Sequence, residues 1–328
     1  MLNNYYYSEL NYAEQAAYSI MRNAILRRLP SCEVQLVNGE SLNRVWKAVV
    51  LENPEAIHYA GLVFSPRITV DRALCRFDYL RTVTEESSCG INEQLFNEKL
   101  NSLIDEIEKK LSPNASDYEV CKSIYDILAS SITYDYDVLR EYQRIRNEHG
   151  DLTAFVQEKC TPFTAYGTLI NKVGVCQGIS KLFNILCDRF DIPCLCIEAV
   201  MNDENQTEHM LNVVELDGDR VFVDVTNGLA VEIDEKKIVR YDYFAVSSQT
   251  LNKAITVNRE FDCNTDDHNY FVKNKTRFVS LNSLIKYLCA YSVSKTNGEV
   301  RCHYAGNGAD DDKLEKIMDE VLSQHCAK

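Results

Sequence analysis

The 328-residue sequence lacks several features that would assign it directly to a class of function. It has no long run of lysine or arginine, and its net charge of −14 provides no positive field to attract a phosphate backbone. No segment approaches the roughly eighteen apolar residues that a membrane helix requires, and the first residues, MLNNYYYSEL, do not resemble a secretion signal. We therefore expect a cytoplasmic protein whose partners are neither nucleic acid nor a membrane.

The sequence also has no CxxC pair, although it contains 13 cysteines. The cysteines are irregularly spaced, and many lie in apolar periodic segments where a reduced thiol packs as a small hydrophobic side chain. A structural zinc site of the finger or ribbon type therefore has no support. Turn chemistry explains the acidic residues Asp217 and Asp219 better than a bound cation does, and no cofactor motif is present. We expect neither a metal nor a cofactor.

Helix and strand signals divide the chain into three parts. Residues 1–90 alternate helical and strand patterns and predict an α+β lobe that ends in the Ser/Gly-rich stretch EESSCG. Residues 91–250 begin with two amphipathic helices, the second of which opens with a capping signature formed by Ser116 and Glu119. Residues 251–328 predict a C-terminal α/β extension. The expected organisation is thus an N-terminal lobe, a core and an extension.

One of the cysteines lies where a thiol could become reactive. In the stretch VGVCQGIS, Cys176 stands between Gly174 and Gly178, and apolar residues spaced as on one face of a helix begin at Val175. Cys176 is therefore predicted in the first turn of a helix, where free N–H groups and the helix dipole lower the pKa of a thiol. We interpret the two glycines as clearance for the backbone of a substrate.

A predicted β-hairpin after this helix carries residues that could activate the thiol. The turn signal Asp217-Gly218 joins two strand patterns, and an even number of loop residues places Leu216 opposite Asp219. Counting along both strands from this pair puts His209 and Asp224 on one face of the sheet, as diagonal neighbours. An unpaired carboxylate would be costly in the apolar run VFVDVT. We therefore predict that Asp224 pairs with His209.

Cys176, His209 and Asp224 together have the chemistry of a thiol-enzyme triad. A cysteine nucleophile needs a base within hydrogen-bonding reach and a third group that orients the base. Here the imidazole would take the thiol proton, the carboxylate would hold the imidazole tautomer, and the N–H of Cys176 would supply one oxyanion donor. Taken singly, the cysteine and the histidine are also explained as structural residues. Their shared geometry with Asp224 favours the triad.

The segments GTLINKVGVCQGISKLFNIL and EHMLNVVELDGDRVFVDVTNG resemble the transglutaminase-like superfamily of papain-type folds. The resemblance covers roughly residues 115–245 and implies an α+β core in which a helix bearing the nucleophile packs on an antiparallel sheet. By this resemblance Cys176 is the nucleophile, His209 the general base and acid, and Asp224 the orienting carboxylate. The N-terminal lobe is similar to extensions on bacterial members, and Tyr134 occupies a family position that is mainly structural.

The region around the triad departs from the family pattern in ways that affect the substrate groove. Family members commonly carry an aromatic residue two places after the histidine and a tryptophan near the aspartate strand, where this chain has Leu211 and Asn227. The second oxyanion donor is therefore not assigned. The candidates for contacts with substrate are Tyr166, Gln177 and Asn212.

Three functions remain open from the sequence. The first is hydrolysis of a protein or peptide amide through a thioester on Cys176, which makes the chain a peptidase or amidase. The second is transfer of the same acyl group to an amine, as in a protein-glutamine γ-glutamyltransferase; the two differ in whether the site admits water or an amine. The third is a catalytically silent binding module that keeps the fold. The substrate and the oligomeric state are not specified by any pattern.

Overall fold

The computed structural model describes residues 2, 4–36, 38–81, 91–233, 235–294, 301–306, 314 and 316. They form two compact units, Met1–Thr265 and Asp266–Lys328. This division differs from the predicted three parts, because the N-terminal lobe shares one hydrophobic interior with the sheet that carries the hairpin. The predicted linker at 85–90 lies outside the described residues. Within the described part of the chain, no helix is both long enough and apolar enough to cross a bilayer.

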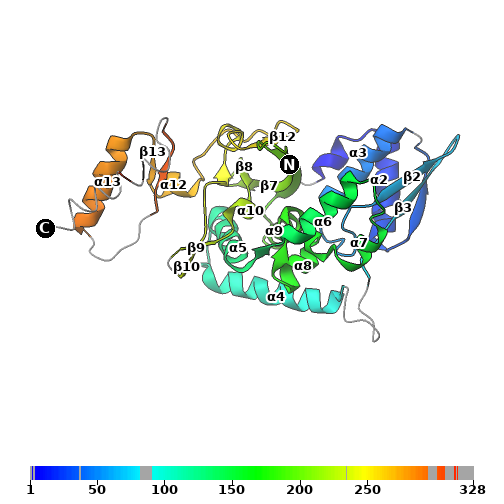
Figure 1. Cartoon of the computed structure of the whole chain (residues 1–328), viewed down its shortest axis with the longest axis horizontal. Helices are drawn as coiled ribbons and strands as arrows, with labels where there is room; N and C mark the ends of the chain where they lie inside the picture. Colours follow the sequence, from blue (N-terminus) through cyan, green and yellow to red (C-terminus); the bar gives the residue numbers. More distant parts are fainter. Residues whose placement is uncertain are drawn as a thin grey trace. The chain divides into compact units, whose positions relative to one another are not determined.

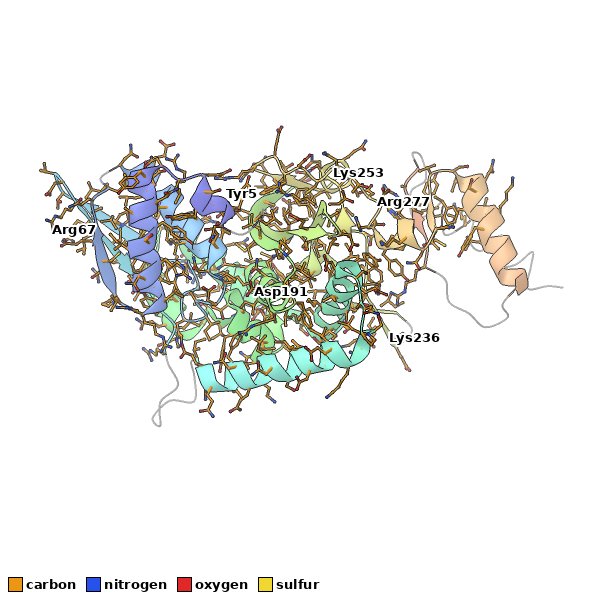
Figure 2. The ribbon with its side chains drawn as sticks, turned by 180° about the vertical axis from the view of Figure 1, so that it is seen from behind. Tyr5, Arg67, Asp191, Lys236, Lys253 and Arg277 are labelled. Carbon is orange, nitrogen blue, oxygen red and sulfur yellow. The ribbon has the colours of Figure 1, made fainter. Side chains whose placement is uncertain are left out.

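The N-terminal lobe packs helices against a small antiparallel sheet. Its elements are α1 (Tyr5–Ser8), α2 (Tyr12–Leu26), β1 (Ser31–Val34), α3 (Gly39–Glu52), β2 (Phe64–Ile68) and β3 (Ala73–Phe77). The sheet has the strand order β1-β3-β2, so both edges belong to short strands. Arg67 lies on β2, at the outer edge of the lobe (Figure 2). Helix α2 begins with a capping box between Asn11 and Glu14, which satisfies two backbone N–H groups.

A layer of helices follows, shown in cyan to green in Figure 1. The elements are α4 (Glu93–Lys110), α5 (Asp117–Ser131), β4 (Thr133–Tyr134), α6 (Tyr136–Asn147), α7 (Thr153–Glu158), the 3₁₀ turn η1 (Thr161–Phe163), α8 (Ala165–Ile170), β5 (Val173–Gly174) and α9 (Cys176–Arg189). The predicted capping box of Ser116 and Glu119 is present at the start of α5. Strands β4 and β5 pair in parallel, which brings residue 134 beside residue 174.

The central sheet has five antiparallel strands in the order β11-β8-β7-β6-β12. Its strands are β6 (Cys194–Met201), β7 (Glu208–Leu216), β8 (Asp219–Val223), β11 (Phe244–Val246) and β12 (Ile255–Val257). The connecting elements are α10 (Val225–Gly228), β9 (Val231–Ile233), β10 (Lys236–Ile238) and α11 (Ser248–Leu251). Leu216 pairs with Asp219 as predicted. Asp217 and Gly218 both have positive φ, as a tight two-residue hairpin turn requires.

Helix α9 packs on this sheet, so the predicted α+β arrangement of a cysteine-bearing helix on an antiparallel sheet is present. The Ser180 hydroxyl donates to the Met210 carbonyl at 2.9 Å, and the Asn184 amide donates to the Cys194 carbonyl at 2.9 Å. Almost every residue of α9 up to Cys187 is buried. The helix is therefore enclosed between the sheet and the other helices of this unit.

The glycines beside Cys176 serve this packing, which corrects the prediction that they give clearance to a substrate. A Cβ atom on Gly178 would lie 2.3 Å from the Pro162 carbonyl oxygen and 2.8 Å from that of Thr164. A Cβ on Gly174 would lie 2.6 Å from the Thr168 hydroxyl. The glycines thus allow the start of α9 to approach η1 and α8 closely.

The second unit is small. It contains α12 (Tyr270–Lys273), β13 (Arg277–Phe278), α13 (Leu281–Ser294) and β14 (His303–Tyr304). Strands β13 and β14 pair in parallel, and Leu284 and Leu288 of α13 form the centre of a separate hydrophobic cluster.

Candidate active site

Cys176 is the first residue of α9, and the way this helix begins places the thiol. The preceding residue, Val175, is the N-cap and has no polar side chain, so the first N–H groups of the helix receive no side-chain cap. Val175 itself is held by its N–H, which donates to the Pro162 carbonyl at 3.0 Å. Cys176 is 8% exposed. The thiol therefore lies in a buried position at the positive end of a helix dipole.

His209 and Asp224 form a buried pair at the end of the hairpin. His209 Nε2 and Asp224 Oδ2 are 2.7 Å apart, and the two residues are 9% and 1% exposed. His209 lies near the start of β7 and Asp224 directly follows β8, so the strand register predicted from the turn brings them together. Because Nε2 is engaged by the carboxylate, Nδ1 is the ring nitrogen that remains for the thiol.

Asn227 gives the carboxylate two further hydrogen bonds, which sequence reasoning missed. Its backbone N–H donates to Asp224 Oδ1 at 3.1 Å, and its side-chain Nδ2 donates to Oδ2 at 2.7 Å. Asp224 is thereby the N-cap of the short helix α10. Asn227, where this chain departs from the pattern of the superfamily it resembles, is thus used here to hold the aspartate. The signal in the sequence was the aspartate itself, a residue type that is favoured at helix N-caps.

The three side chains shift one another's pKa values toward a charged pair. Burial acts to raise the pKa of the Cys176 thiol, but the hydrogen bond and charge of His209 outweigh it, so the pKa is lowered. Burial acts to lower the pKa of His209, but Asp224 and the thiol raise it well above its usual value. Burial opposes ionisation of Asp224, yet His209 and Asn227 bring the pKa of the carboxyl below its usual value. The arrangement favours a thiolate beside an imidazolium.

Tyr134 lies beside the thiol, although the resemblance implied a mainly structural position for it. The β4–β5 pairing sets Tyr134 opposite Gly174, and the Asp135 N–H donates to the Gly174 carbonyl at 3.1 Å. The Tyr134 hydroxyl interacts with both the backbone N–H and the thiol of Cys176, and burial raises the pKa of this phenol. A phenol that stays neutral can donate a hydrogen bond. The contact joins residues far apart in the sequence, so no local pattern predicts it.

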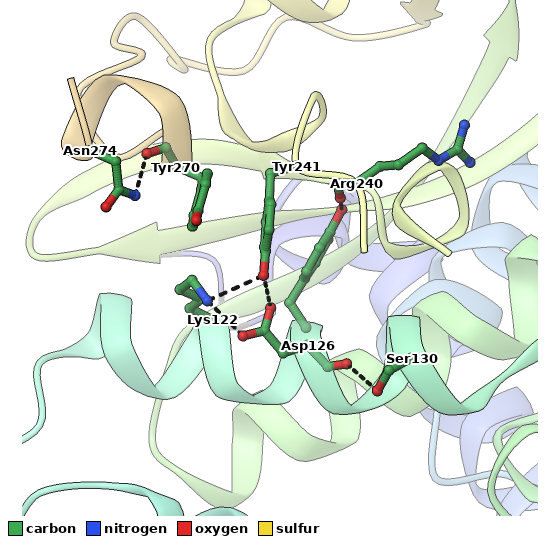
Figure 3. A network of polar contacts seen from close by, with 8 residues as sticks. Lys122, Asp126, Ser130, Arg240, Tyr241, Tyr270 and Asn274 are labelled. Atoms are coloured by element: carbon green, nitrogen blue, oxygen red, sulfur yellow. Dashed lines mark hydrogen bonds and ion pairs between the residues drawn. The ribbon is translucent and has the colours of Figure 1, made fainter. Parts of the chain in front are cut away.

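Tyr125 of α5 connects the helix layer to the chain that follows β8, which begins with Asp224. Its buried hydroxyl donates to the Arg240 carbonyl at 2.7 Å and lies 3.5 Å from the Asp224 carbonyl. A Cβ on Gly228 would lie 1.8 Å from this hydroxyl, so only glycine fits there. Figure 3 shows the Arg240 carbonyl in this bond, next to the Lys122, Asp126 and Tyr241 network on the same face of α5.

A surface groove of about 600 Å³ reaches the histidine. Its walls come from the α5–β4 segment, α6, the connection between β6 and β7, and residues 226–240. Tyr134, His209 and Asn227 belong to its lining. Tyr136, which is 65% exposed, lies at its rim. The groove gives the site an approach from solvent on the histidine side.

The three predicted substrate contacts lie outside the lining of this groove. Tyr166 is buried on α8 and stacks on a phenylalanine of α4. Asn212 is 1% exposed and donates to the Ser180 carbonyl at 3.2 Å. The Gln177 amide donates to the Ala60 carbonyl of the N-terminal lobe. Each of these side chains is engaged by contacts within the protein and does not line the groove.

The polar side chains of the site form hydrogen bonds with one another and are not arranged as metal ligands. Both oxygens of Asp224 and Nε2 of His209 are used in hydrogen bonds within the site. Within the described ranges of the chain, no group of three or more His, Cys, Asp or Glu side chains is placed to hold a metal ion.

Comparisons with known proteins find likeness among solved structures. No family model matches the sequence, and no curated protein matches it. A solved transglutaminase (TGase) shares 13% identity over 63% of this chain and 53% of its own, with a TM-score of 0.33. A structure from Cytophaga hutchinsonii, assigned to the cysteine proteases, shares 14% identity over 54% of this chain and 65% of its own, with a TM-score of 0.28. The chain spans less than two thirds of either neighbour.

Proposed function

We propose that the chain is a thiol-dependent enzyme that attacks a protein or peptide amide and hands the acyl group to water. The observation that carries this proposal is the buried 2.7 Å pair of His209 and Asp224 beside the first turn of the Cys176 helix. A buried imidazole bound to a carboxylate, next to a thiol of lowered pKa, is the arrangement that nucleophilic thiol catalysis needs. The solvent-exposed groove reaches His209, the residue that would activate water.

The reaction follows from the roles of the three side chains. The Cys176 thiol gives its proton to His209 Nδ1, and the thiolate sulfur bonds to the carbonyl carbon of the amide. Collapse of the tetrahedral intermediate breaks the C–N bond, and the imidazolium gives its proton to the departing amine. Water then adds to the thioester while His209 takes its proton, and release of the carboxylic acid restores the thiol. Asp224 holds the imidazole in the tautomer that can act.

The proposed experiment separates hydrolysis from transfer. The full chain is incubated with an N-blocked Gln-Gly dipeptide and a peptide library, with and without a fluorescent primary amine. We expect hydrolysed products and no fluorescent adduct, because the open groove admits water. Cys176→Ala should abolish product, whereas Cys302→Ser, which removes a half-buried thiol in the second unit, should retain it. A fluorescent adduct that requires Cys176 would establish transfer, and activity that survives Cys176→Ala would refute the thiol mechanism.

Tyr134 is the proposed second oxyanion donor. An oxyanion needs donors that point at the position where negative charge develops, and the N–H of Cys176 supplies one of them. The Tyr134 hydroxyl already interacts with that N–H and with the thiol, and its raised pKa keeps the proton on the phenol. The hydroxyl can therefore turn its proton to a substrate oxygen bound at the same place.

Tyr134→Phe should lower kcat/KM for amide hydrolysis by about 10²-fold, as for loss of one oxyanion donor. Because the Tyr134 hydroxyl helps to lower the pKa of the thiol, alkylation of Cys176 by iodoacetamide is compared at a pH at which the thiol is ionised in both proteins. There it should change little, because displacement of iodide forms no oxyanion. Tyr136→Phe is the matched control, since this neighbouring tyrosine is exposed at the groove rim. An increase in hydrolysis in Tyr134→Phe would show instead that the hydroxyl blocks the site.

A further inference from the structure

The groove beside His209 carries more positive charge than the chain as a whole. Its lining includes three cationic side chains, Arg140, Lys237 and Arg240, against two carboxylates, Glu208 and Glu232. The whole chain has a net charge of −14. Cations gathered in a concave site raise the local concentration of anions. An excess of cations in a groove of an otherwise acidic chain suits a ligand that carries negative charge.

The partners of these charges single out Arg240. Lys237 stands directly opposite Glu232 in the β9–β10 pair, so these two charges offset each other. Glu208 pairs with an arginine of α6, and Arg140 pairs with an aspartate on its own helix. Among the described residues, the Arg240 guanidinium forms no hydrogen bond or ion pair, although it lines the groove. It is the cation that remains available for a ligand.

The backbone of Arg240 is fixed relative to the catalytic aspartate. Its carbonyl accepts the Tyr125 hydroxyl at 2.7 Å, and its N–H donates to the Gly228 carbonyl at 3.1 Å. Gly228 ends α10, the helix whose N-cap is Asp224. The guanidinium extends away from Lys122 and Asp126 in Figure 3. Arg240 is thus a charged side chain on a backbone that two hydrogen bonds tie to the Asp224 segment.

One residue of the groove lining has a buried polar atom that forms no hydrogen bond among the described residues. The Thr226 hydroxyl oxygen is buried and forms no hydrogen bond within the described residues, and Thr226 lines the groove. An unsatisfied buried hydroxyl is costly unless a ligand completes it. Thr226 lies two residues after Asp224, in helix α10. The last residue of this helix, Gly228, accepts the hydrogen bond from the Arg240 N–H.

We propose that Arg240 binds a carboxylate of the acyl substrate, so that the site prefers peptides carrying a carboxylate close to the amide under attack. This inference rests on the proposed function and adds the class of substrate. A guanidinium matches a carboxylate in geometry and charge and binds it through two parallel hydrogen bonds. Arg140 and Lys237 add to the field that draws the anion into the groove.

The test uses protection of Cys176 against iodoacetamide, which reports binding even without turnover. Three peptides are compared on the full chain: N-blocked Gln-Gly with a free C-terminal carboxylate, its C-terminal amide, and N-blocked Gln-Glu amide with only a side-chain carboxylate. We expect either acid to protect at a concentration about tenfold lower than the neutral amide. The better of the two acids identifies whether the carboxylate is terminal or on a side chain. The preference should weaken as salt is added.

Arg240→Gln should bring the acids and the amide to equal protection, and Arg240→Lys should keep part of the preference. Arg67→Gln is the matched control, because it removes a positive charge from the exposed β2 strand outside the groove (Figure 2). Hydrolysis of the same peptides is measured in parallel, so a silent binding module would show protection without products. Equal protection by acid and amide in the unsubstituted protein, or a preference that survives Arg240→Gln, would overturn the proposal.

Discussion

Asp224→Asn should lower kcat/KM for amide hydrolysis by about 10³- to 10⁴-fold while leaving the fold intact. The carboxylate bonds Nε2 of His209, so it keeps the proton on that nitrogen and leaves Nδ1 free to accept the thiol proton. An asparagine can present its NH₂ group to Nε2 instead, which moves the imidazole proton to Nδ1. The imidazole then has no lone pair for the thiol, although the packing volume is unchanged.

The same substitution should change the pH dependence of Cys176 alkylation by iodoacetamide. In the native site the thiol pKa is lowered by His209, whose own pKa is raised by Asp224, so the thiolate persists below the pH at which an ordinary thiol ionises. Without the carboxylate, His209 loses its proton at lower pH and no longer stabilises the thiolate. The pH of half-maximal alkylation should therefore rise. Asp126→Asn, in the neighbouring network, is the control, and an unchanged profile in Asp224→Asn would contradict the proposed coupling.

Gly178→Ala should destabilise the protein by about 3 kcal/mol, the upper part of the range for overpacking. The added Cβ would lie 2.3 Å and 2.8 Å from two backbone carbonyl oxygens, those of Pro162 and Thr164, which cannot move without shifting η1. Thermal or urea unfolding measures the loss. Gly39→Ala is the matched control, because its Cβ would meet only one methyl group at 3.9 Å at the start of a helix.

This substitution also separates the two interpretations of the glycine. A glycine that clears space for substrate would give an alanine variant of normal stability and low activity. A glycine that allows α9 to pack gives a variant that unfolds more easily, and the structure supports the second outcome. A stable but inactive Gly178→Ala protein would restore the interpretation based on sequence.

The sequence predicted the parts of this site that depend on short-range rules. The even number of residues in the Asp217-Gly218 turn was sufficient to predict that His209 and Asp224 lie together, because side chains alternate along a strand. The capping box of Ser116 and Glu119 was also predictable, because the two residues interact within one helical turn. The start of the α9 helix at Cys176 followed from apolar spacing.

Other parts of the site depend on contacts between distant segments, and no local pattern reports them. Tyr134 reaches Cys176 only because β4 and β5 pair, and the groove collects residues from four segments. The N-terminal lobe could not be recognised as part of the same unit, because its core is completed by residues more than a hundred positions away. The prediction that Asn212 contacts substrate also depended on such contacts. Its strand lies beneath α9, where the side-chain amide donates to the Ser180 carbonyl.

The contact between Tyr125 and Gly228 also constrains how this protein can diverge. The tyrosine hydroxyl fills the space where a side chain on residue 228 would begin, with only 1.8 Å to an added Cβ. A relative that replaces the glycine must therefore shorten or move the tyrosine, and the carbonyl of Arg240 then loses its donor. Positions 125 and 228 should consequently vary together across species, as a coupled pair that touches no substrate.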